Sequence, residues 1–434
     1  MKHIFSFLLF TLLGYCGISQ TTLSTKLDAQ IDALEAKVIE WRRDFHEFPE
    51  LSNREFETSK KVATFLESLG IEVQTDVAKT GVKGILRGGK PGPVVALRAD
   101  MDGLPVDERV ELPFASKQRT TFLEKETGVM HACGHDTHVA MLMGTAQILA
   151  GMREELQGTV VFIFQPAEEG APPGEEGGAE LMVKEGVLEN PKVDVVFGQH
   201  ISSTLEAGKI RYKAGGIMAA SNRLVIKVKG KQSHGSRPWA GVDPITVSAQ
   251  IIMGLQTIIS RQTELTKEAA VISIGKISGG VRGNIIPEEV EMIGTVRTLD
   301  PDMQTKIHED IRRTVTLIAE SAGATAEVEI SKGYPVTYND PELTKAMLPS
   351  LYASAGEENV LVTLASTGAE DFSFYAREVP GLFYFLGGMQ PGMNPLDAPG
   401  HHTPDFYIDE SGLKLGVKTL VQLTLDYMEA HGGK

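Results

Sequence analysis

The sequence predicts an α/β fold with a mostly parallel central sheet and helices on both faces, plus an inserted ferredoxin-like α+β domain. Three observations lead to this prediction. Short apolar runs alternate with helical stretches, residues 215–330 follow the order β-α-β-β-α-β, and the first type of pattern returns after residue 330. Strands that alternate with helices are typical of parallel sheets buried on both faces. A chain of 434 residues is long enough for two or three domains.

Residues 1–19 are predicted to be a signal peptide. An apolar run over residues 4–13 is followed by small residues, and the run is too short to span a membrane. Cleavage is expected after Ser19. The alternative is a lipoprotein attached through Cys16, which is disfavoured because Tyr15 is too large for the usual site. We therefore expect an exported protein, periplasmic or secreted.

The rest of the chain is predicted to form a larger domain interrupted by a smaller one. Residues 20–214 and 331–434 form the larger domain, and residues 215–330 form the insertion. The strands expected in the insertion are 224–229, 270–277, 290–298 and 326–330, with helices at 244–261 and 301–322. This order of elements is that of a ferredoxin-like sandwich.

Composition narrows the class of function. The net charge is −15, with 23% charged and 42% hydrophobic residues, and no basic stripe fits nucleic acid or an anionic membrane. Once the signal peptide is removed, Cys133 is the only cysteine, so it cannot form a disulfide within the chain. A redox role for Cys133 is disfavoured because no second cysteine could resolve it.

Four potential metal ligands lie close together at the start of a predicted helix. They are His131, Cys133, His135 and His138. The helix is expected to bury one face between residues 139 and 149, with Asp136 or Thr137 as its cap. Thiolate and imidazole are ligands that zinc prefers. The alternative is that one histidine caps the helix and Cys133 is a small buried hydrophobic residue.

Acids and a histidine follow three of the predicted strands. Asp100 and Asp102 follow the strand at 94–97, Glu168 and Glu169 follow the strand at 159–164, and His200 follows the strand at 193–197. In parallel sheets, ligands bind outside the carboxyl ends of the strands, so these side chains are expected at one rim. If one of the two adjacent glutamates binds a metal ion, the other is free to take a proton from water.

Other histidines and polar loops are open to two interpretations. His46 and Glu47, on a helix predicted at residues 27–48, are expected at the surface or behind the site. His401 and His402 lie in a Pro/Gly loop and become relevant because the metal site still lacks a ligand. His234, Arg282 and Asn284 lie in loops of the insertion that are either ordinary turns or part of a site.

The chain resembles a known family along nearly the whole of its mature length. The motifs that carry the resemblance occur in order: RRDFHEFPELS, ALRADMDGLP, MHACGHDTHVAM, FQPAEEG, SHGSRP, NIIPEE, TGAEDFSFY and HHTPDF. They are similar to those of the M20 metallopeptidase family, and of its amidohydrolase branch in particular. That branch contains hippurate hydrolases, N-acyl-amino-acid amidohydrolases and auxin-conjugate hydrolases.

The resemblance implies a catalytic domain that holds two divalent metal ions, and a smaller lid or dimerisation domain. The implied metal ligands are Cys133, His135, Glu169, His200 and His402, with the thiolate bridging both ions. Glu168 would be the general base, and His234 would stabilise the oxyanion, from the same or a partner subunit. Asn284 and Arg282 would face the substrate. Zn is the expected metal, and Mn, Co or Ni would also fit.

The implied function is cleavage of the amide bond of N-acyl amino acids or similar small conjugates. One alternative is a dipeptidase or carboxypeptidase of the same fold. Another is a secreted binding protein without catalysis, which the retention of every candidate ligand disfavours. Three features depart from the family pattern: Gln199 and His401 stand where apolar residues are usual, and the loop at 171–178 is longer than in many relatives.

Overall fold

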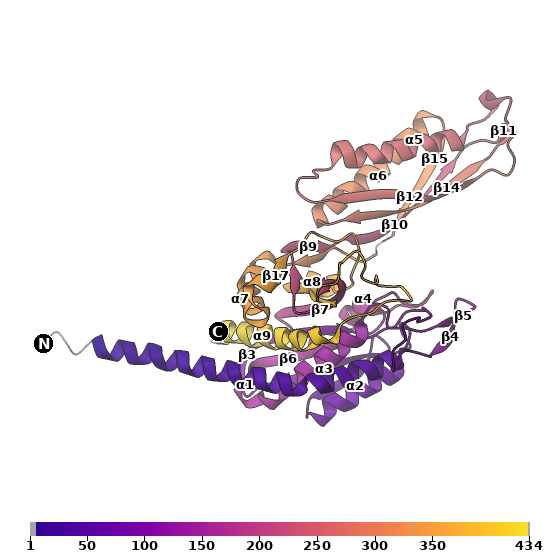
Figure 1. Cartoon of the computed structure of the whole chain (residues 1–434). Helices are drawn as coiled ribbons and strands as arrows, with labels where there is room; N and C mark the ends of the chain where they lie inside the picture. Colours follow the sequence, from indigo (N-terminus) through magenta and orange to yellow (C-terminus); the bar gives the residue numbers. More distant parts are fainter. Residues whose placement is uncertain (1–5, 332, 433–434) are drawn as a thin grey trace. The chain divides into compact units, whose positions relative to one another are not determined.

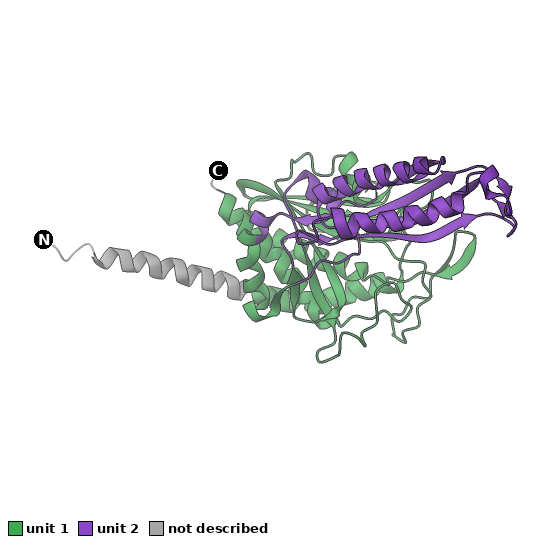
Figure 2. Cartoon of the chain, turned by 90° about the horizontal axis from the view of Figure 1, so that it is seen from above, with its two compact units in different colours: residues 1–212, 345–362, 383–434 green, residues 213–344, 363–382 purple. Residues whose placement is uncertain are grey.

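The structure is a computed structural model that describes residues 6–331 and 333–432, with side chains from residue 27 onward. The predicted signal peptide at 1–19 therefore lies outside the residues whose side chains are described. Two compact units are present: unit 1 comprises residues 1–212, 345–362 and 383–434, and unit 2 comprises residues 213–344 and 363–382 (Figure 2). Within the part of the chain that the structure describes, no helix is both long enough and apolar enough to cross a membrane.

Unit 1 is built on an eight-stranded sheet with the order β1-β2-β6-β3-β7-β18-β8-β17 (Figure 1). In that order, the strands are β1 Glu72–Val77, β2 Gly81–Arg87, β6 Gln157–Gln165, β3 Lys90–Asp100, β7 Val195–Glu206, β18 Gly381–Met389, β8 Ile210–Tyr212 and β17 Val360–Val362. A separate hairpin pairs β4 Arg119–Phe122 with β5 Lys125–Gly128.

The sheet is mixed, with a parallel centre. β3 pairs in parallel with both β6 and β7, whereas β2 is antiparallel to β1 and β6, and β18 is antiparallel to β8. Residues 78–80 are too few for the crossover that a parallel β1–β2 pair would need. The predicted α/β class is therefore confirmed, with a short antiparallel addition that the apolar runs alone did not indicate.

In unit 1, two helices pack against a third. The helices assigned to this unit are α1 Ser6–Glu47, α2 Phe56–Ser68, α3 His135–Gly151, α4 Gly178–Lys184, α7 Pro341–Ala355, which begins in unit 2, and α9 Leu413–His431. α1 and α9 pack against α3 and against each other, and α3 also contacts the sheet at β3. Consequently α3 is buried on nearly all sides. The prediction of a single buried face was wrong, because α3 is a core helix.

Unit 2 contains a four-stranded antiparallel sheet with the order β12-β14-β10-β15. Its main elements are β10 Ala220–Lys229, α5 Pro244–Thr257, β12 Ala270–Gly279, β14 Glu289–Thr298, α6 Pro301–Ser321 and β15 Thr325–Ile330. Smaller elements are β9 Gly215–Met218, β11 Ser233–His234, β13 Ile285–Ile286, β16 Thr337–Asn339 and α8 Ser373–Glu378. The strand order and the two helices confirm the ferredoxin-like sandwich.

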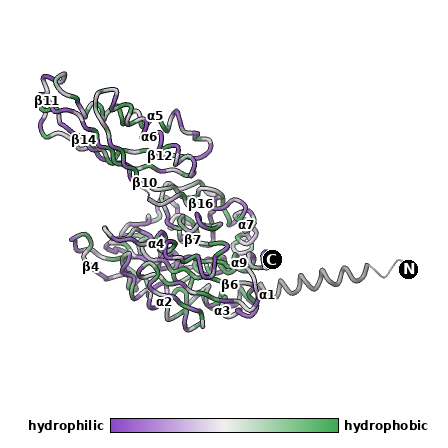
Figure 3. Tube along the Cα trace, turned by 180° about the vertical axis from the view of Figure 1, so that it is seen from behind, coloured by the Kyte–Doolittle hydropathy of each residue, from purple (hydrophilic) through white to green (hydrophobic). Residues whose placement is uncertain are grey.

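The helices of unit 2 begin where the sequence indicates. Asp243 accepts hydrogen bonds from the backbone N–H groups of Ile245 and Thr246, and Pro244 occupies the first helical position of α5. Apolar residues of α5 and α6 form one core with the sheet, including Ile251 and Ile311. Hydrophobic and hydrophilic stretches alternate along the trace of both units (Figure 3).

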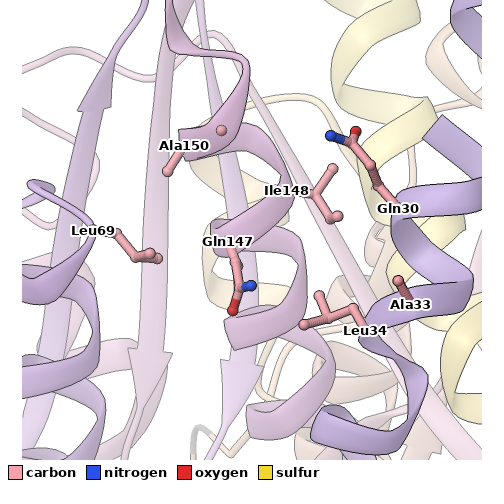
Figure 4. A pocket seen from close by; sticks show the side chains of 8 residues that line it. Gln30, Ala33, Leu34, Leu69, Gln147, Ile148 and Ala150 are labelled. Carbon is pink, nitrogen blue, oxygen red and sulfur yellow. The ribbon is translucent and has the colours of Figure 1, made fainter. Parts of the chain in front are cut away.

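A pocket of about 510 Å³ lies in unit 1 between α1 and α3 (Figure 4). It is lined by Gln30, Ala33, Leu34, Leu69, Gln147, Ile148, Ala150 and Gly151. These lining residues include no titratable side chain and none of the predicted site residues. This pocket therefore offers none of the side chains expected of a metal centre.

Candidate metal centre

Cys133 and His135 are placed by a glycine at the start of α3. Gly134 precedes the helix with φ of +93°, and Thr137 Oγ1 donates a hydrogen bond to its carbonyl oxygen at 2.6 Å. Asp136 does not cap the helix, because its carboxylate instead contacts Arg42 and His46 at 2.8 and 2.9 Å. The predicted side-chain cap was therefore wrong: no side chain caps the N-terminus of α3.

Gly134→Ala is expected to destabilise the protein and displace both flanking side chains. A Cβ at this position would lie 2.4 Å from Ile201 Cγ2, and L-residues rarely adopt this backbone conformation. Strain and overpacking of this kind cost about 1–3 kcal/mol each. Thermal unfolding with and without added metal measures the effect, and Gly151→Ala, where a Cβ meets nothing within 4 Å, is the matched control. Equal melting temperatures for the two variants would contradict the expectation.

The structure brings the five predicted ligands of unit 1 together. Cys133 Sγ lies 3.4 Å from His200 Nε2 and 3.2 Å from His402 Nε2, and His402 Nε2 lies 3.0 Å from Glu169 Oε1. Five sets of ligand atoms among the described residues each lie within 4.8 Å of one another: Cys133/His135/His200, Cys133/Glu169/His402, His135/Glu168/Glu169, Asp100/His135/His138 and Glu168/Glu370/Asp371. Cys133 belongs to two of these sets, so its thiolate is positioned to be shared.

His135 presents one nitrogen to this cluster. In its neutral form, which a metal ligand must adopt, the imidazole donates from Nδ1 to the backbone oxygen of Asp102 at 2.9 Å and carries its lone pair on Nε2. Nε2 is fully buried, has no hydrogen-bond partner among the described residues, and lies 3.9 Å from Glu168 Oε2. A buried imidazole nitrogen with no partner is costly unless it binds something, so this site fits a metal ion.

Asp102 connects several parts of the site. Its carboxylate lies 3.2 Å from His135 Nδ1 and accepts hydrogen bonds from Ser52 Oγ at 2.7 Å and from the backbone N–H groups of Glu168 and Glu169 at 3.0 Å each. The sequence predicts that Asp102 lies at the rim of the sheet but does not indicate its function. The available signal was its position just after a buried strand, two residues beyond Asp100.

Asp102→Asn is expected to weaken metal binding while the fold persists. The amide cannot hold His135 in the same tautomer and accept the other hydrogen bonds at once, and losses of such supporting contacts typically cost about 10–100-fold in metal affinity. Titration with a competing chelator measures this change. Asp44→Asn, which alters an exposed ion pair with Lys61, is the control. Unaltered affinity in Asp102→Asn would contradict the assigned role.

His138 and Asp100 are used within the protein itself. His138 Nδ1 pairs with Asp100 Oδ1 at 2.5 Å, and its Nε2 accepts from the backbone N–H of Ile201 at 2.8 Å. Arg98 occupies the other oxygen of Asp100 at 2.6 Å. Although burial alone would raise the pKa of Asp100, Arg98 and the neighbouring histidines lower it well below its usual value. Both nitrogens of His138 are engaged, so this side chain supports the site from behind.

His131 is buried, and neither ring nitrogen has a hydrogen-bond partner among the described residues. Burial lowers its pKa to about 4, so its imidazole is neutral near pH 7. His46 is also buried and lies between Asp136 and Glu108, at 2.9 and 3.1 Å. It contacts the residue after His135, which agrees with the expected place behind the site.

His200 lies inside a strand and not after it. β7 continues to Glu206, but its pairing with β3 stops at Gly198, so His200 still reaches the rim of the parallel centre. His200 Nδ1 donates to the backbone oxygen of Ile201 at 2.6 Å, which leaves Nε2 facing Cys133. Gln199 accepts from the hydroxyl of Tyr384 at 2.9 Å in the core, which explains a polar residue at this buried position.

The two histidines of the PGHHTPDF loop differ in their contacts. His401 Nε2 accepts from the backbone N–H of Ser203 at 3.2 Å, and its Nδ1 lies 3.7 Å from Cys133 Sγ. His402 approaches both Cys133 and Glu169 more closely, and hydrogen bonding to Glu169 raises its pKa. His402 therefore fits the ligand position better than His401, in agreement with the ligand that the family resemblance implies.

The electrostatics of the cluster favour bound cations. Burial, together with the charges of Glu169 and Glu168, raises the pKa of the Cys133 thiol well above its usual value. Burial would lower the pKa of His135, but Asp100 and Asp102 raise it to about 10. A buried group of carboxylates stabilises positive charge on whatever enters it, and a divalent cation would in turn stabilise the thiolate.

The remaining predicted residues lie in unit 2. His234 is in β11, which pairs with β13, and the backbone N–H of Gly235 donates to the carbonyl oxygen of Asn284 at 2.8 Å. Arg282 is two residues before Asn284, and all three side chains are exposed. His234 Nδ1 accepts from the backbone N–H of Ser236 at 3.0 Å, which leaves Nε2 accessible. Unit 2 thus gathers these residues at one end.

The buried thiol, imidazoles and carboxylates that gather at the start of α3 and beyond the parallel strands form a candidate metal centre. Residues 96–426 match the model of Peptidase family M20/M25/M40, and the chain belongs to this family. Its relatives include amidohydrolases and carboxypeptidases. The chain is therefore a hydrolase that acts on amide or peptide bonds, and it belongs to the amidohydrolase branch of the M20 family.

Three relatives illustrate the similarity. The chain is 42% identical to thermostable carboxypeptidase 1 of Saccharolobus solfataricus, with 91% of this chain and 96% of the relative covered. It is 39% identical to N-acetylcysteine deacetylase of Bacillus subtilis, with 92% and 98% covered. The crystal structure of YXEP of Bacillus subtilis, described as a dinuclear metal-binding peptidase of family M20, superimposes with a TM-score of 0.76 at 37% identity, with 92% and 99% covered.

Proposed function

We propose that this protein cleaves the amide bond of N-acyl amino acids or similar small amide conjugates, at a centre of two divalent metal ions. The observation that carries the proposal is the pair of ligand sets that share Cys133 beside Glu168. The proposed ligands are Cys133, His135, Glu169, His200 and His402. The similarity to a deacetylase that acts on N-acetylcysteine supports this substrate class.

Divalent ions in such a site supply Lewis acidity, which lowers the pKa of water toward neutral and polarises the amide carbonyl. Glu168 is the proposed general base: it takes the proton of the attacking water and passes it to the departing amine. Glu169, next in the chain, lies 3.0 Å from His402 and serves as a ligand. Adjacent glutamates thus divide two tasks that one carboxylate cannot perform at the same time.

Zn is the proposed metal, because a thiolate and imidazoles are ligands it favours, and Mn, Co and Ni suit the same donor set. His234 is proposed to stabilise the oxyanion, with Asn284 and Arg282 facing the substrate. A homodimer formed through the insertion would let a partner supply His234. Sedimentation velocity combined with mixing of His234→Ala and Glu168→Gln subunits tests this: recovery of activity in the mixture supports a shared site, and its absence argues against one.

A carboxypeptidase is the second candidate function, favoured by the similarity to thermostable carboxypeptidase 1. One experiment separates the two candidates: elemental analysis of the purified protein, followed by a screen of N-acetyl and N-benzoyl amino acids against dipeptides. Turnover of the N-acyl amino acids at much higher kcat/KM supports the proposal. Preference for the dipeptides would replace it with a peptidase.

We propose that the protein is exported after cleavage near Ser19. An apolar run followed by small residues at the amino terminus supports this proposal. Fractionation of the producing cells, with mass spectrometry of the mature amino terminus, tests it. A full-length protein that starts at Met1 in the cytoplasmic fraction would refute export.

A further inference from the structure

The residue before the proposed general base has an unusual backbone conformation. Ala167 has φ of +53° and is almost completely buried, 1% exposed. A residue with a Cβ rarely adopts this left-handed conformation, which glycine occupies at no such cost. The orientation of the Glu168 side chain depends on this backbone conformation of Ala167. Contacts with neighbouring residues must therefore stabilise the conformation.

Three consecutive backbone N–H groups of this loop each donate to a buried carboxyl group. Ala167 donates to Glu55 Oε1 at 2.8 Å, while Glu168 and Glu169 donate to the two oxygens of Asp102 at 3.0 Å. Asp102 also contacts His135, a proposed metal ligand, so a change at Asp102 would affect metal binding as well as this loop. Glu55, in contrast, reaches the loop through Ala167.

Glu55 is itself buried, and both of its carboxyl oxygens are hydrogen-bonded. It is fully buried just before α2, and its second carboxyl oxygen is 2.6 Å from Thr80 Oγ1. Burial and the nearby charge of Asp102 raise the pKa of Glu55 to about 8. Glu55 accepts from the backbone N–H of Ala167 through one oxygen and from the hydroxyl of Thr80 through the other. A glutamine side chain keeps a carbonyl oxygen that can accept from Ala167, and its amide nitrogen can donate to the Thr80 hydroxyl.

The segment that carries Glu55 makes further contacts with the same loop, one of them indirect. Asn53 donates to Glu175 and to the carbonyl oxygen of Glu176 at 3.1 Å each, and Ser52 donates at 2.7 Å to Asp102, which in turn accepts from the N–H groups of Glu168 and Glu169. These contacts join residues 52–55 to the chain on both sides of Glu168. The segment therefore has the anchorage needed to hold a strained peptide.

We propose that Glu55 is a positioning residue that directs the Glu168 carboxylate by holding the N–H of Ala167 in its left-handed conformation. The inference rests on the proposed role of Glu168 as general base. Glu55 needs no contact with substrate for this role. Because small misplacements of a catalytic group slow the chemical step, its effect belongs in kcat rather than in KM.

The kinetic test compares Glu55→Ala with Glu55→Gln. Glu55→Ala is expected to lower kcat at least about tenfold, with KM within about twofold and unchanged metal content. Glu55→Gln, whose carbonyl oxygen can still accept from the N–H of Ala167, is expected to keep kcat within about threefold of the original. Glu50→Ala is the matched control, because Glu50 also accepts two backbone N–H groups, those of Glu57 and Thr58, away from this loop. Equal losses of kcat in Glu55→Ala and Glu55→Gln would overturn the proposal.

Hydrogen exchange of the metal-free protein tests the same idea without reference to activity. Glu55→Ala is expected to speed exchange in the peptide covering residues 166–170 by about tenfold or more, while Glu55→Gln and Glu50→Ala leave it unchanged. If Glu55→Ala does not fold, Glu55→Asp, whose shorter side chain cannot reach Ala167, takes its place. Unaltered exchange would overturn the positioning role. An active Glu168→Gln would instead refute the proposed general base and leave the exchange result standing.

Discussion

Glu168→Gln is expected to lower kcat by a factor on the order of 10²–10⁴ or more while metal binding persists. The amide has nearly the same shape as the carboxylate but cannot accept the proton of the attacking water. Its backbone N–H still donates to Asp102, so the loop should keep its conformation. Steady-state kinetics on an N-acyl amino acid, with elemental analysis of the same sample, measures both quantities.

The matched control is Glu176→Gln, which changes an exposed acid on the same loop that pairs with Lys184 at 2.9 Å. This variant is expected to keep its activity. A fully active Glu168→Gln protein would show that another group accepts the proton. Loss of metal together with activity would instead show that Glu168 is a metal ligand. Its carboxylate is close enough to His135 and Glu169 for that role.

Cys133→Ala is expected to reduce the number of metal ions bound per chain and, with it, the activity. Cys133 Sγ is the atom common to the set with His135 and His200 and to the set with Glu169 and His402. Removing it takes a ligand from both sets, so the loss of affinity should exceed the roughly 10–100-fold cost of removing a supporting contact. Elemental analysis after dialysis, across a range of free zinc, measures the loss.

The fold is expected to tolerate Cys133→Ala, since the side chain is small and the described structure contains no disulfide at this position. Circular dichroism should therefore match the unaltered protein. Met101→Ala, another buried change near the end of β3, controls for packing defects. Unchanged metal stoichiometry in Cys133→Ala would remove the thiolate from the proposed site.

Short sequence motifs predicted much of this site. Ligand types clustered before a helix, and acids placed just after buried strands, predicted which segments would meet. The general location holds because parallel strands end at a common rim. The details of α3 were missed, since a helix that is surrounded on all sides has no polar face from which its burial can be recognised.

Residues that act through other residues were harder to recognise. Asp102 was visible as an acid at the rim, but its three kinds of partner come from residues 52, 135 and 168–169. Glu55 resembled an ordinary acid at a helix start, and only folding places it against Ala167. Hydrogen bonds between segments 33 to 112 residues apart leave no periodic trace in the sequence.

The sequence by itself determined the α/β class, the ferredoxin-like insertion and the types of residue available for a metal centre, because these depend on periodicity and on the chemistry of short motifs. Tertiary structure alone decided which nitrogen of His200 faces Cys133 and that both nitrogens of His138 are hydrogen-bonded, to Asp100 and Ile201. It also decided that Ala167, before Glu168, has a strained backbone conformation. These features arise from side chains and peptide groups that meet across the fold, where distance and orientation, and not order along the chain, set the energy.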